Sequence, residues 1–375
     1  MAGIYIHIPF CRKACTYCNF HFSTTLRGKD DLLRALAQEI SLQKDFLRGE
    51  QISTIYFGGG TPSLLNGEEL KRLFAALEAA FDITALEECT LEANPDDITH
   101  AYLKELRSTP INRFSLGVQS FREEDLRYMN RAHTAQQSEY AIKAAQDAGF
   151  SNLSIDLIYG TPGLSDAAWR ENLDKMNALE IPHFSSYALT VEEGTALHHA
   201  IEKKKMTPVD AEQSAAQFQL LMEAAPAMGY EHYEISNLAK PGHYARHNTS
   251  YWQGVPYLGL GPSAHSFHGR ERRWNAANNA LYTHSILAQH TIPYESEILT
   301  DEQRLNEYIM TSLRTMWGCD LGRISRDWGS GAAKDILADA APYIAAGKAF
   351  VKDGRLYLTN EGRLFADAIA GDLFR

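Results

Sequence analysis

The sequence is poor in positive charge for its length. Its 375 residues include 36 Lys and Arg against 47 Asp and Glu, which gives a formal net charge of −11. Proteins that bind nucleic acid usually carry clustered Lys and Arg. The two short basic runs, Arg270–Arg273 and Lys203–Lys205, are typical of a solvated surface. We therefore expect no nucleic-acid partner.

Long apolar runs are also missing. A membrane-spanning helix needs about 20 consecutive apolar residues, and the longest apolar runs here are much shorter. The first residues lack the charged segment and apolar stretch of a secretory signal. We expect a cytoplasmic protein, and the sequence leaves a peripheral membrane contact and a homodimer open.

Cysteine is scarce and unevenly spread. The chain has five cysteines, and three of them lie close together at Cys11, Cys15 and Cys18. An odd and clustered set does not suit a disulfide framework. Three thiolates at this spacing can converge on one centre, and soft sulfur ligands select iron-sulfur clusters, zinc or copper. Cys89 and Cys319 are expected to be ordinary buried residues.

The fourth ligand decides between these metals. A structural zinc site is closed and tetrahedral, and His21 could complete it. Three cysteines on a four-iron cluster instead leave one iron open for another ligand. The residues alone leave both alternatives open.

The first 230 residues alternate between β-rich segments and amphipathic helical segments. Strands are predicted at Ile4–Ile8, Ile52–Phe57, Cys89–Ala93, Arg113–Val118, Asn152–Ile158 and His183–Leu189. Helices are predicted at Asp30–Leu47, Glu68–Phe81, Ala101–Arg107, Glu123–Ala148, Ala167–Leu179 and Asp210–Met228. This alternation predicts parallel strands joined by right-handed crossovers, in an open sheet or a barrel.

Polar residues and glycines gather where these strands end. They are Gly58, Gly59, Gly60, Glu92, Gln119, Asp156 and Tyr187. Ligands bind at this edge in both architectures. Because all six strands, with the cysteine loop after the first, point to one mouth, we expect an α/β fold that forms an incomplete barrel.

The pattern changes after residue 230. Residues 231–300 are rich in Tyr, His, Gly and Asn, and we expect an irregular segment that packs on the barrel. Residues 301–375 are expected to form a separate small α+β domain. Helices are predicted at Glu302–Met316, Ala332–Ala346 and Glu361–Leu373, with a hairpin turning at Asp353-Gly354. Helices followed by a hairpin resemble a winged helix, although the acidic balance argues against DNA binding.

The Cys-x3-Cys-x2-Cys pattern, with Tyr17 before its third cysteine, resembles the signature of radical S-adenosylmethionine (SAM) enzymes. The run YFGGGTP at 56–62 is similar to their glycine motif. The resemblance implies a partial (β/α)6 barrel and a 4Fe-4S cluster on Cys11, Cys15 and Cys18, with SAM on the open iron. It implies that SAM is lined by Tyr5, Tyr17, Gly58, Gly59, Gly60, Thr61, Glu92, Gln119, Arg131 and Asp156. The carboxylates of Glu92 and Asp156 would accept hydrogen bonds from the ribose hydroxyls, and the guanidinium of Arg131 would bind a carboxylate. We assign no catalytic residue.

The phrases YIHIPFC, YFGGGTPS, GVQSF, DLIYGTPG and YEISN, with the C-terminal domain, resemble one branch of that family. It holds the oxygen-independent coproporphyrinogen III oxidases and the HemW-type haem chaperones. The oxidases have Cys-x-Cys after the motif, whereas here Asn19-Phe20 follows Cys18, as in the chaperones.

A histidine in an aromatic stretch is usually structural, but the HNxxYW string at 247–252 resembles the haem-binding motif of these chaperones. This likeness implies haem contact at His247, Tyr251 and Trp252, with His243 and His265 as weaker candidates.

These observations favour a haem chaperone that binds a 4Fe-4S cluster, SAM and haem. It would hand haem to acceptor proteins such as respiratory haem enzymes. The alternative is an oxygen-independent oxidase that decarboxylates coproporphyrinogen III by radical chemistry. An RNA-modifying radical SAM enzyme is disfavoured by the charge.

Overall fold

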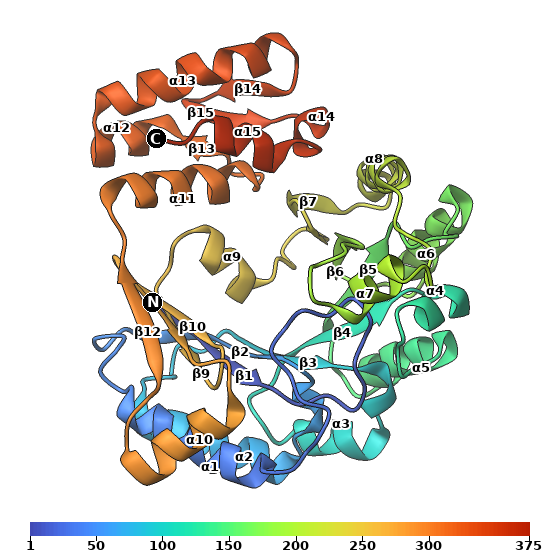
Figure 1. Ribbon diagram of the computed structural model, residues 1–375, viewed down its shortest axis with the longest axis vertical. Helices are drawn as coiled ribbons and strands as arrows, with labels where there is room; N and C mark the ends of the chain where they lie inside the picture. The colour runs from blue at the N-terminus through green and yellow to red at the C-terminus, as the bar shows by residue number, and fades with distance from the viewer.

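A curved sheet of parallel strands forms the main body of the protein (Figure 1), in a computed structural model that describes all 375 residues. Six strands pair in chain order: β1 (Ala2–Ile8), β2 (Ile52–Gly59), β3 (Glu88–Ala93), β4 (Arg113–Gln119), β5 (Asn152–Tyr159) and β6 (His183–Ala188). The main connecting helices are α1 (Lys29–Leu42), α2 (Gly67–Ala80), α3 (His100–Leu106), α5 (Ala135–Asp147), α6 (Asp166–Ala178) and α8 (Ala211–Ala227). The predicted partial barrel is confirmed.

The alternation of side chains along β1 separates the core from the interior of the barrel. Ile4, Ile6 and Ile8 are fully buried in the core under the helices, whereas Tyr5 and His7 line a cavity on the other face. Successive side chains of a strand point to opposite faces. The polar residues of the strands therefore face the inside of the barrel.

Residues 231–300 are regular, although we expected an irregular segment. At one end of the sheet, β8 (Asn237–Ala239) and β7 (Glu231–Glu234) continue antiparallel from β6. At the other end, β9 (Tyr257–Leu260) lies parallel to β1 and is followed by β10 (His265–His268), β11 (Glu271–Asn275) and β12 (Tyr294–Ile298). Two helices, α9 (Arg246–Trp252) and α10 (Asn279–Gln289), complete the segment. Strands of three to five residues are too short to give a clear alternating pattern.

The single helix predicted over Glu123–Ala148 is wrong. The chain forms α4 (Glu123–Tyr128), then a break, then α5. Asn130 has a left-handed backbone (φ 57°), which ends the first helix. Thr134 starts the second helix, because its side chain and that of Gln137 form a reciprocal capping box. Arg131 therefore lies in a loop, where its side chain is free to reach the barrel mouth.

The C-terminal domain has its own core. It contains α11 (Asp301–Leu313), β13 (Cys319–Asp320), α12 (Leu321–Trp328), α13 (Ser330–Ala345), β14 (Ala349–Lys352), β15 (Arg355–Leu358), α14 (Asn360–Arg363) and α15 (Ala366–Asp372). The hairpin at Asp353-Gly354 forms as predicted. The last helix, expected to be continuous, is interrupted at Leu364-Phe365, and α12 was not expected. In Figure 1 this domain stands above the edge of the sheet that carries β9 to β12.

Backbone pairing fixes the small domain to the barrel. The amide of Ile235 donates to the carbonyl of Arg314 (3.0 Å), and the amide of Met316 donates to the carbonyl of Tyr233 (2.9 Å). The guanidinium of Arg314 also pairs with the buried carboxylate of Glu234 at 3.2 Å. Backbone hydrogen bonds and a partly buried ion pair thus connect the two domains. None of the helices has both the length and the apolar character that a membrane crossing requires.

Candidate functional site

The three clustered cysteines lie in the loop that follows β1, at the carboxyl end of that strand. All three side chains are half-buried. The loop is held from outside: the amide of Thr16 donates to the carbonyl of Met129 (3.1 Å), and its own carbonyl accepts from Leu197 (2.8 Å). The side chain of Asn130 donates to the carbonyl of Ala14 at 2.8 Å. The break between α4 and α5 therefore supports the cysteine loop.

The thiols are close enough to affect one another. Burial raises the pKa of Cys11 to about 11, and Cys18 and Cys15 raise it further by repulsion. Such a group favours its thiolate form only when a positive centre binds it. The Nε2 atom of His21 is 2.8 Å from Oδ1 of Asn279 on α10, so this nitrogen is engaged away from the thiols. The donors fit a soft metal centre with three cysteine ligands and an open position.

A chain of hydrogen bonds joins two of the thiols. Thr61 Oγ1 donates to Cys11 Sγ (3.4 Å), and Asn94 Nδ2 donates to Thr61 Oγ1 (3.2 Å). Arg131 donates through Nη2 to Asn94 Oδ1 (2.6 Å) and through Nη1 to Cys15 Sγ (3.1 Å). Asn94 was not predicted from the sequence as a site residue, although it directly follows the third predicted strand, at the edge where polar residues gather. This Thr61–Asn94–Arg131 chain orients both thiols from the ends of β2 and β3 and from the loop between α4 and α5.

The glycine run at the end of β2 packs against β1 without space for side chains. A Cβ atom on Gly60 would lie 2.6 Å from the carbonyl oxygen of Phe10 and 2.8 Å from that of Ile8. Gly59 has φ +105°, and a Cβ there would meet the ring of His7 at 2.5 Å. Gly58 faces Tyr5, Tyr56 and Glu92 inside the barrel. The run therefore exposes backbone beside the cysteine loop, which can bind a ligand closely.

Two carboxylates from neighbouring regions of the barrel lack cationic partners of their own. Burial raises the pKa of Glu92 to about 7, although Tyr56 donates to its Oε1 at 2.8 Å. Burial raises the pKa of Asp156 to about 6. The negative charge of Asp156 also raises the pKa of Glu92. Hydroxyl donors from a ligand would satisfy these carboxylates.

The remaining residues predicted to line SAM surround the same mouth. Gln119 has a left-handed backbone (φ 67°) next to an irregularity in the β4–β5 pairing, a feature that often marks a functional site. Arg131 Nε is buried without a hydrogen-bond partner, which leaves a donor for a bound carboxylate. Tyr5 donates to or accepts from His7 Nδ1 at 3.2 Å. Tyr17 packs against the small apolar group that includes Leu126 and Met129.

A cavity of about 990 Å³ opens beside the cysteine loop, between the barrel and the C-terminal domain. Asn19, Phe20 and His21 bring the loop into its wall. Its aromatic lining is Tyr5, Phe20, Tyr251, Trp252, Tyr257, Phe267, Tyr308 and Trp328, and its arginines are Arg272, Arg304 and Arg323. This volume lies in the range typical of small-molecule sites.

Of the three residues predicted to contact haem, Tyr251 and Trp252 line this cavity and His247 does not. His247 is fully buried, with Nδ1 2.8 Å from Thr54 Oγ1 and Nε2 2.7 Å from the hydroxyl of Tyr251. Of the weaker candidates, His265 lines the cavity, whereas His243 is exposed elsewhere.

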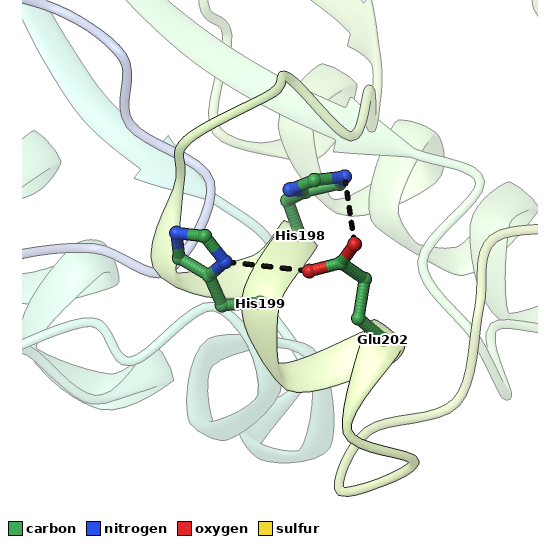
Figure 2. A group of neighbouring side chains, drawn as sticks. All are labelled: His198, His199 and Glu202. Atoms are coloured by element: carbon green, nitrogen blue, oxygen red, sulfur yellow. Dashed lines mark hydrogen bonds and ion pairs between the residues drawn. The ribbon is translucent and has the colours of Figure 1, made fainter.

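Another cluster of side chains of the types that ligate metals lies on the short helix α7 (Ala196–Glu202). His198 and His199 approach the carboxylate of Glu202 at 3.9 and 3.4 Å (Figure 2). His199 and Glu202 are more than half exposed. Pairs of this kind are common on helix surfaces. The helix contacts the site through the bond from Leu197 to Thr16 and through the apolar group that Leu197 shares with Met129 and Tyr17.

Comparison with known proteins gives full-length matches. The profile of the Radical SAM superfamily matches residues 5–176, and that of the HemN C-terminal domain matches residues 299–365. The heme chaperone HemW of Mycobacterium tuberculosis is 35% identical over 99% of this chain and 94% of its own length. That of Bacillus subtilis is 32% identical over 99% and 98%. The solved structure of coproporphyrinogen III oxidase (HemN) from Escherichia coli superposes with a TM-score of 0.85 and 25% identity, over 100% of this chain and 90% of that one.

Proposed function

Because this chain belongs to the HemW family of radical SAM proteins, we propose that it is a haem chaperone. In this proposal it binds a 4Fe-4S cluster and SAM at the barrel mouth, holds haem in the adjoining cavity, and passes the haem to acceptor proteins such as respiratory haem enzymes. Its place of action would be the cytoplasm. The observation that carries the proposal is the position of the cavity, whose wall includes the residues directly after Cys18.

Cys11, Cys15 and Cys18 would hold the cluster, and Thr61 and Arg131 would fix the orientation of two of these ligands. When bound, such a cluster offers an open iron to SAM and can supply an electron. The unpaired Nε of Arg131 is suited to the SAM carboxylate, and Glu92 and Asp156 are suited to its ribose hydroxyls.

Haem is the cargo in this proposal. Its flat apolar macrocycle matches the aromatic walls of the cavity, and its two carboxylates match the arginines. Tyr251 and Trp252 would contact the macrocycle directly. His247 would contribute from behind Tyr251, to which it is hydrogen-bonded.

The test begins with anaerobic reconstitution. We expect about four irons per chain and the brown colour of a cluster, both lost in Cys15→Ala and retained in the control Cys89→Ala, because Cys89 is buried in the core. The reconstituted protein should bind SAM, take up one haem and transfer it to an apo haem protein. A colourless protein that holds only zinc and ignores SAM would overturn the proposal.

The second candidate is an oxygen-independent coproporphyrinogen III oxidase, favoured by the structural similarity to HemN over the whole chain. Phe20 lies in the cavity wall where the oxidases are expected to have a further cysteine, and this residue argues against the oxidase. Incubation with coproporphyrinogen III, SAM and a reductant separates the two candidates. Release of carbon dioxide with a vinyl-bearing product would establish the oxidase.

A further inference from the structure

We propose that His265 provides the imidazole ligand of the haem iron, that Arg304 and Arg323 bind the haem carboxylates, and that His247 is a positioning residue for Tyr251. This inference rests on the proposed function, because it specifies how the cavity would hold haem.

His265 is the cavity histidine whose ring nitrogens are both uncommitted. It lies at the start of β10 and makes no side-chain hydrogen bond; its ring stacks on Trp274 at 6.2 Å between centroids and 28° between planes. The other two histidines in the cavity wall are engaged: His7 bonds through both nitrogens, and His21 bonds Asn279. Partial burial and the nearby guanidinium of Arg272 lower the pKa of His265. The neutral imidazole that an iron requires is therefore favoured.

The arginines differ in how firmly they are paired. Arg272 on β11 pairs with Glu297 (3.1 Å) and with Glu307 on α11, so its charge is already balanced. Arg304 pairs with the exposed Asp301 (3.2 Å), and Arg323 pairs only weakly with Asp327 (3.5 Å). Exposed pairs of this kind exchange partners at little cost. Two guanidiniums therefore remain for two carboxylates.

These two arginines lie over an aromatic pair in the cavity lining. The rings of Tyr308 and Trp328 stack 5.9 Å apart at 18°. Arg323 lies over Tyr308 at 4.3 Å, and Arg304 lies over Trp328 at 5.8 Å. A macrocycle that contacts the edges of this stack inside the cavity would bring its carboxylates within reach of both guanidiniums, and His265, on the barrel side of the cavity, would supply the imidazole ligand of its iron.

His247 lacks access to the cavity. Both its nitrogens are bonded, and the ring packs against Tyr56 at 5.2 Å between centroids. Ligation of iron by His247 would break these bonds and displace Tyr251. The bond from Nε2 to the Tyr251 hydroxyl instead fixes a ring that does line the cavity.

The first experiment is a ferric haem titration followed by visible and electron paramagnetic resonance spectra. Wild type should give one site with imidazole signatures. His265→Ala should lose these signatures and bind at least about tenfold more weakly, and added imidazole should restore the spectrum. His247→Gln should keep the ligation signatures while changing affinity. The exposed His284→Ala is the matched control.

The outcomes separate the two levels of the proposal. If wild type takes up no haem at a single site, the proposed function fails. If wild type binds and His265→Ala keeps an unchanged imidazole spectrum, the chaperone stands and the assignment to His265 is overturned. Loss of the imidazole signature in His247→Gln alone would transfer that role to His247.

The second experiment tests the carboxylates. Arg304→Gln with Arg323→Gln should weaken haem binding about tenfold or more, as loss of charge-assisted bonds predicts. The same double variant should bind haem dimethyl ester as wild type does. The control is Arg326→Gln, because Arg326 lies on α12 with Arg323 but is exposed and outside the cavity. An equal loss for haem and its ester would overturn the role of these arginines.

Discussion

Glu92 shows how the site can trade stability for binding. Its carboxyl group lies in the barrel interior with Tyr56 as a donor but with no cation paired to it. Burial raises its pKa from an ordinary 4.5 to about 7. The folded protein therefore binds an extra proton between these pH values, so unfolding becomes easier as the pH rises through this interval.

We predict that Glu92→Gln flattens this dependence. Wild type should lose up to about 3 kcal/mol of unfolding free energy from this group as the pH rises from 4.5 to 7. The variant should be more stable than wild type above pH 7, yet bind SAM about 10- to 100-fold more weakly, because a charge-assisted bond is lost. Urea unfolding at several pH values measures the first effect and calorimetry the second.

The exposed Glu171→Gln on α6 should change neither quantity, and it serves as the control. Equal stability of wild type and Glu92→Gln at pH 5 and pH 8 would show that the carboxyl group is not desolvated.

Gly60 gives a second prediction at this scale. Gly60→Ala should destabilise the protein by about 1–3 kcal/mol and reduce cluster content, because the new Cβ meets the backbone of Ile8 and Phe10, which cannot move aside easily. Thermal unfolding and iron analysis measure these effects. Gly331→Ala in α13, where a Cβ has open space, should be neutral or stabilising. A stable Gly60→Ala with full cluster content would contradict the role of this close packing.

Residues beside recognisable motifs could be placed from the sequence. Glu92 and Asp156 lie near the carboxyl ends of predicted strands, and these ends of parallel strands meet at one mouth. The contacts of Asn94 and His247 could not be predicted from the sequence. The contacts of Asn94 with Thr61 and Arg131 join three separate segments, and the burial of His247 depends on Thr54 and Tyr251. Side-chain contacts across such distances leave no local pattern.

At the scale of elements, the break between α4 and α5 is the feature that shapes the site. It turns what looked like one helix into two and brings Asn130 and Arg131 to the cysteine loop. The left-handed backbone of Asn130 costs a non-glycine residue about 1–2 kcal/mol. The bond from its side chain to the carbonyl of Ala14 offsets part of that cost.

We predict that two substitutions at this position separate the backbone from the bond. Asn130→Gly keeps the left-handed conformation but loses the bond to Ala14, so cluster retention should fall while stability changes little. Asn130→Ala should lose the bond and also about 1 kcal/mol or more of unfolding free energy. Chemical denaturation and iron retention after gel filtration test both. Equal stability of the two variants would contradict the strained turn.

The long elements could be predicted and the short ones could not. β1 to β6 and most barrel helices have clear periodicity and match the predicted segments within a few residues. The strands from β7 to β12 have only three to five residues each, and pairing with distant partners defines them. The helix break was not predicted because the residues around it keep an apolar spacing close to that of one continuous helix. The turn is stabilised instead by a tertiary contact, the hydrogen bond from Asn130 to the carbonyl of Ala14.

At the scale of the whole molecule, the cavity belongs to neither domain alone. One wall comes from β1, the cysteine loop, α9 and β9 to β11, and the other comes from α11 and α12. Its lining residues run from Tyr5 to Trp328 in the sequence. The ion pair between Arg272 and Glu307 already connects the two walls. No local sequence pattern predicts this cavity, because it forms only where the two domains pack together.

A ligand that fills this cavity should therefore hold the two domains together. We predict that haem slows amide hydrogen exchange in β10 and β11 of the barrel and in α11 and α12 of the C-terminal domain at once. Binding to the folded form stabilises every opening that disrupts the site. With haem at about 100 times its dissociation constant, the protection should approach 100-fold where local opening exposes the cavity.

The control comes from the same molecule. Exchange in α5 and α6, which lie on the outer side of the barrel away from the cavity, should change far less for openings confined to these helices. His265→Ala at the same haem concentration should show weaker protection on both walls together, because one bound molecule contacts both. Protection confined to the barrel, with α11 and α12 unchanged, would mean that haem binds outside this cavity and that the C-terminal domain has a separate role.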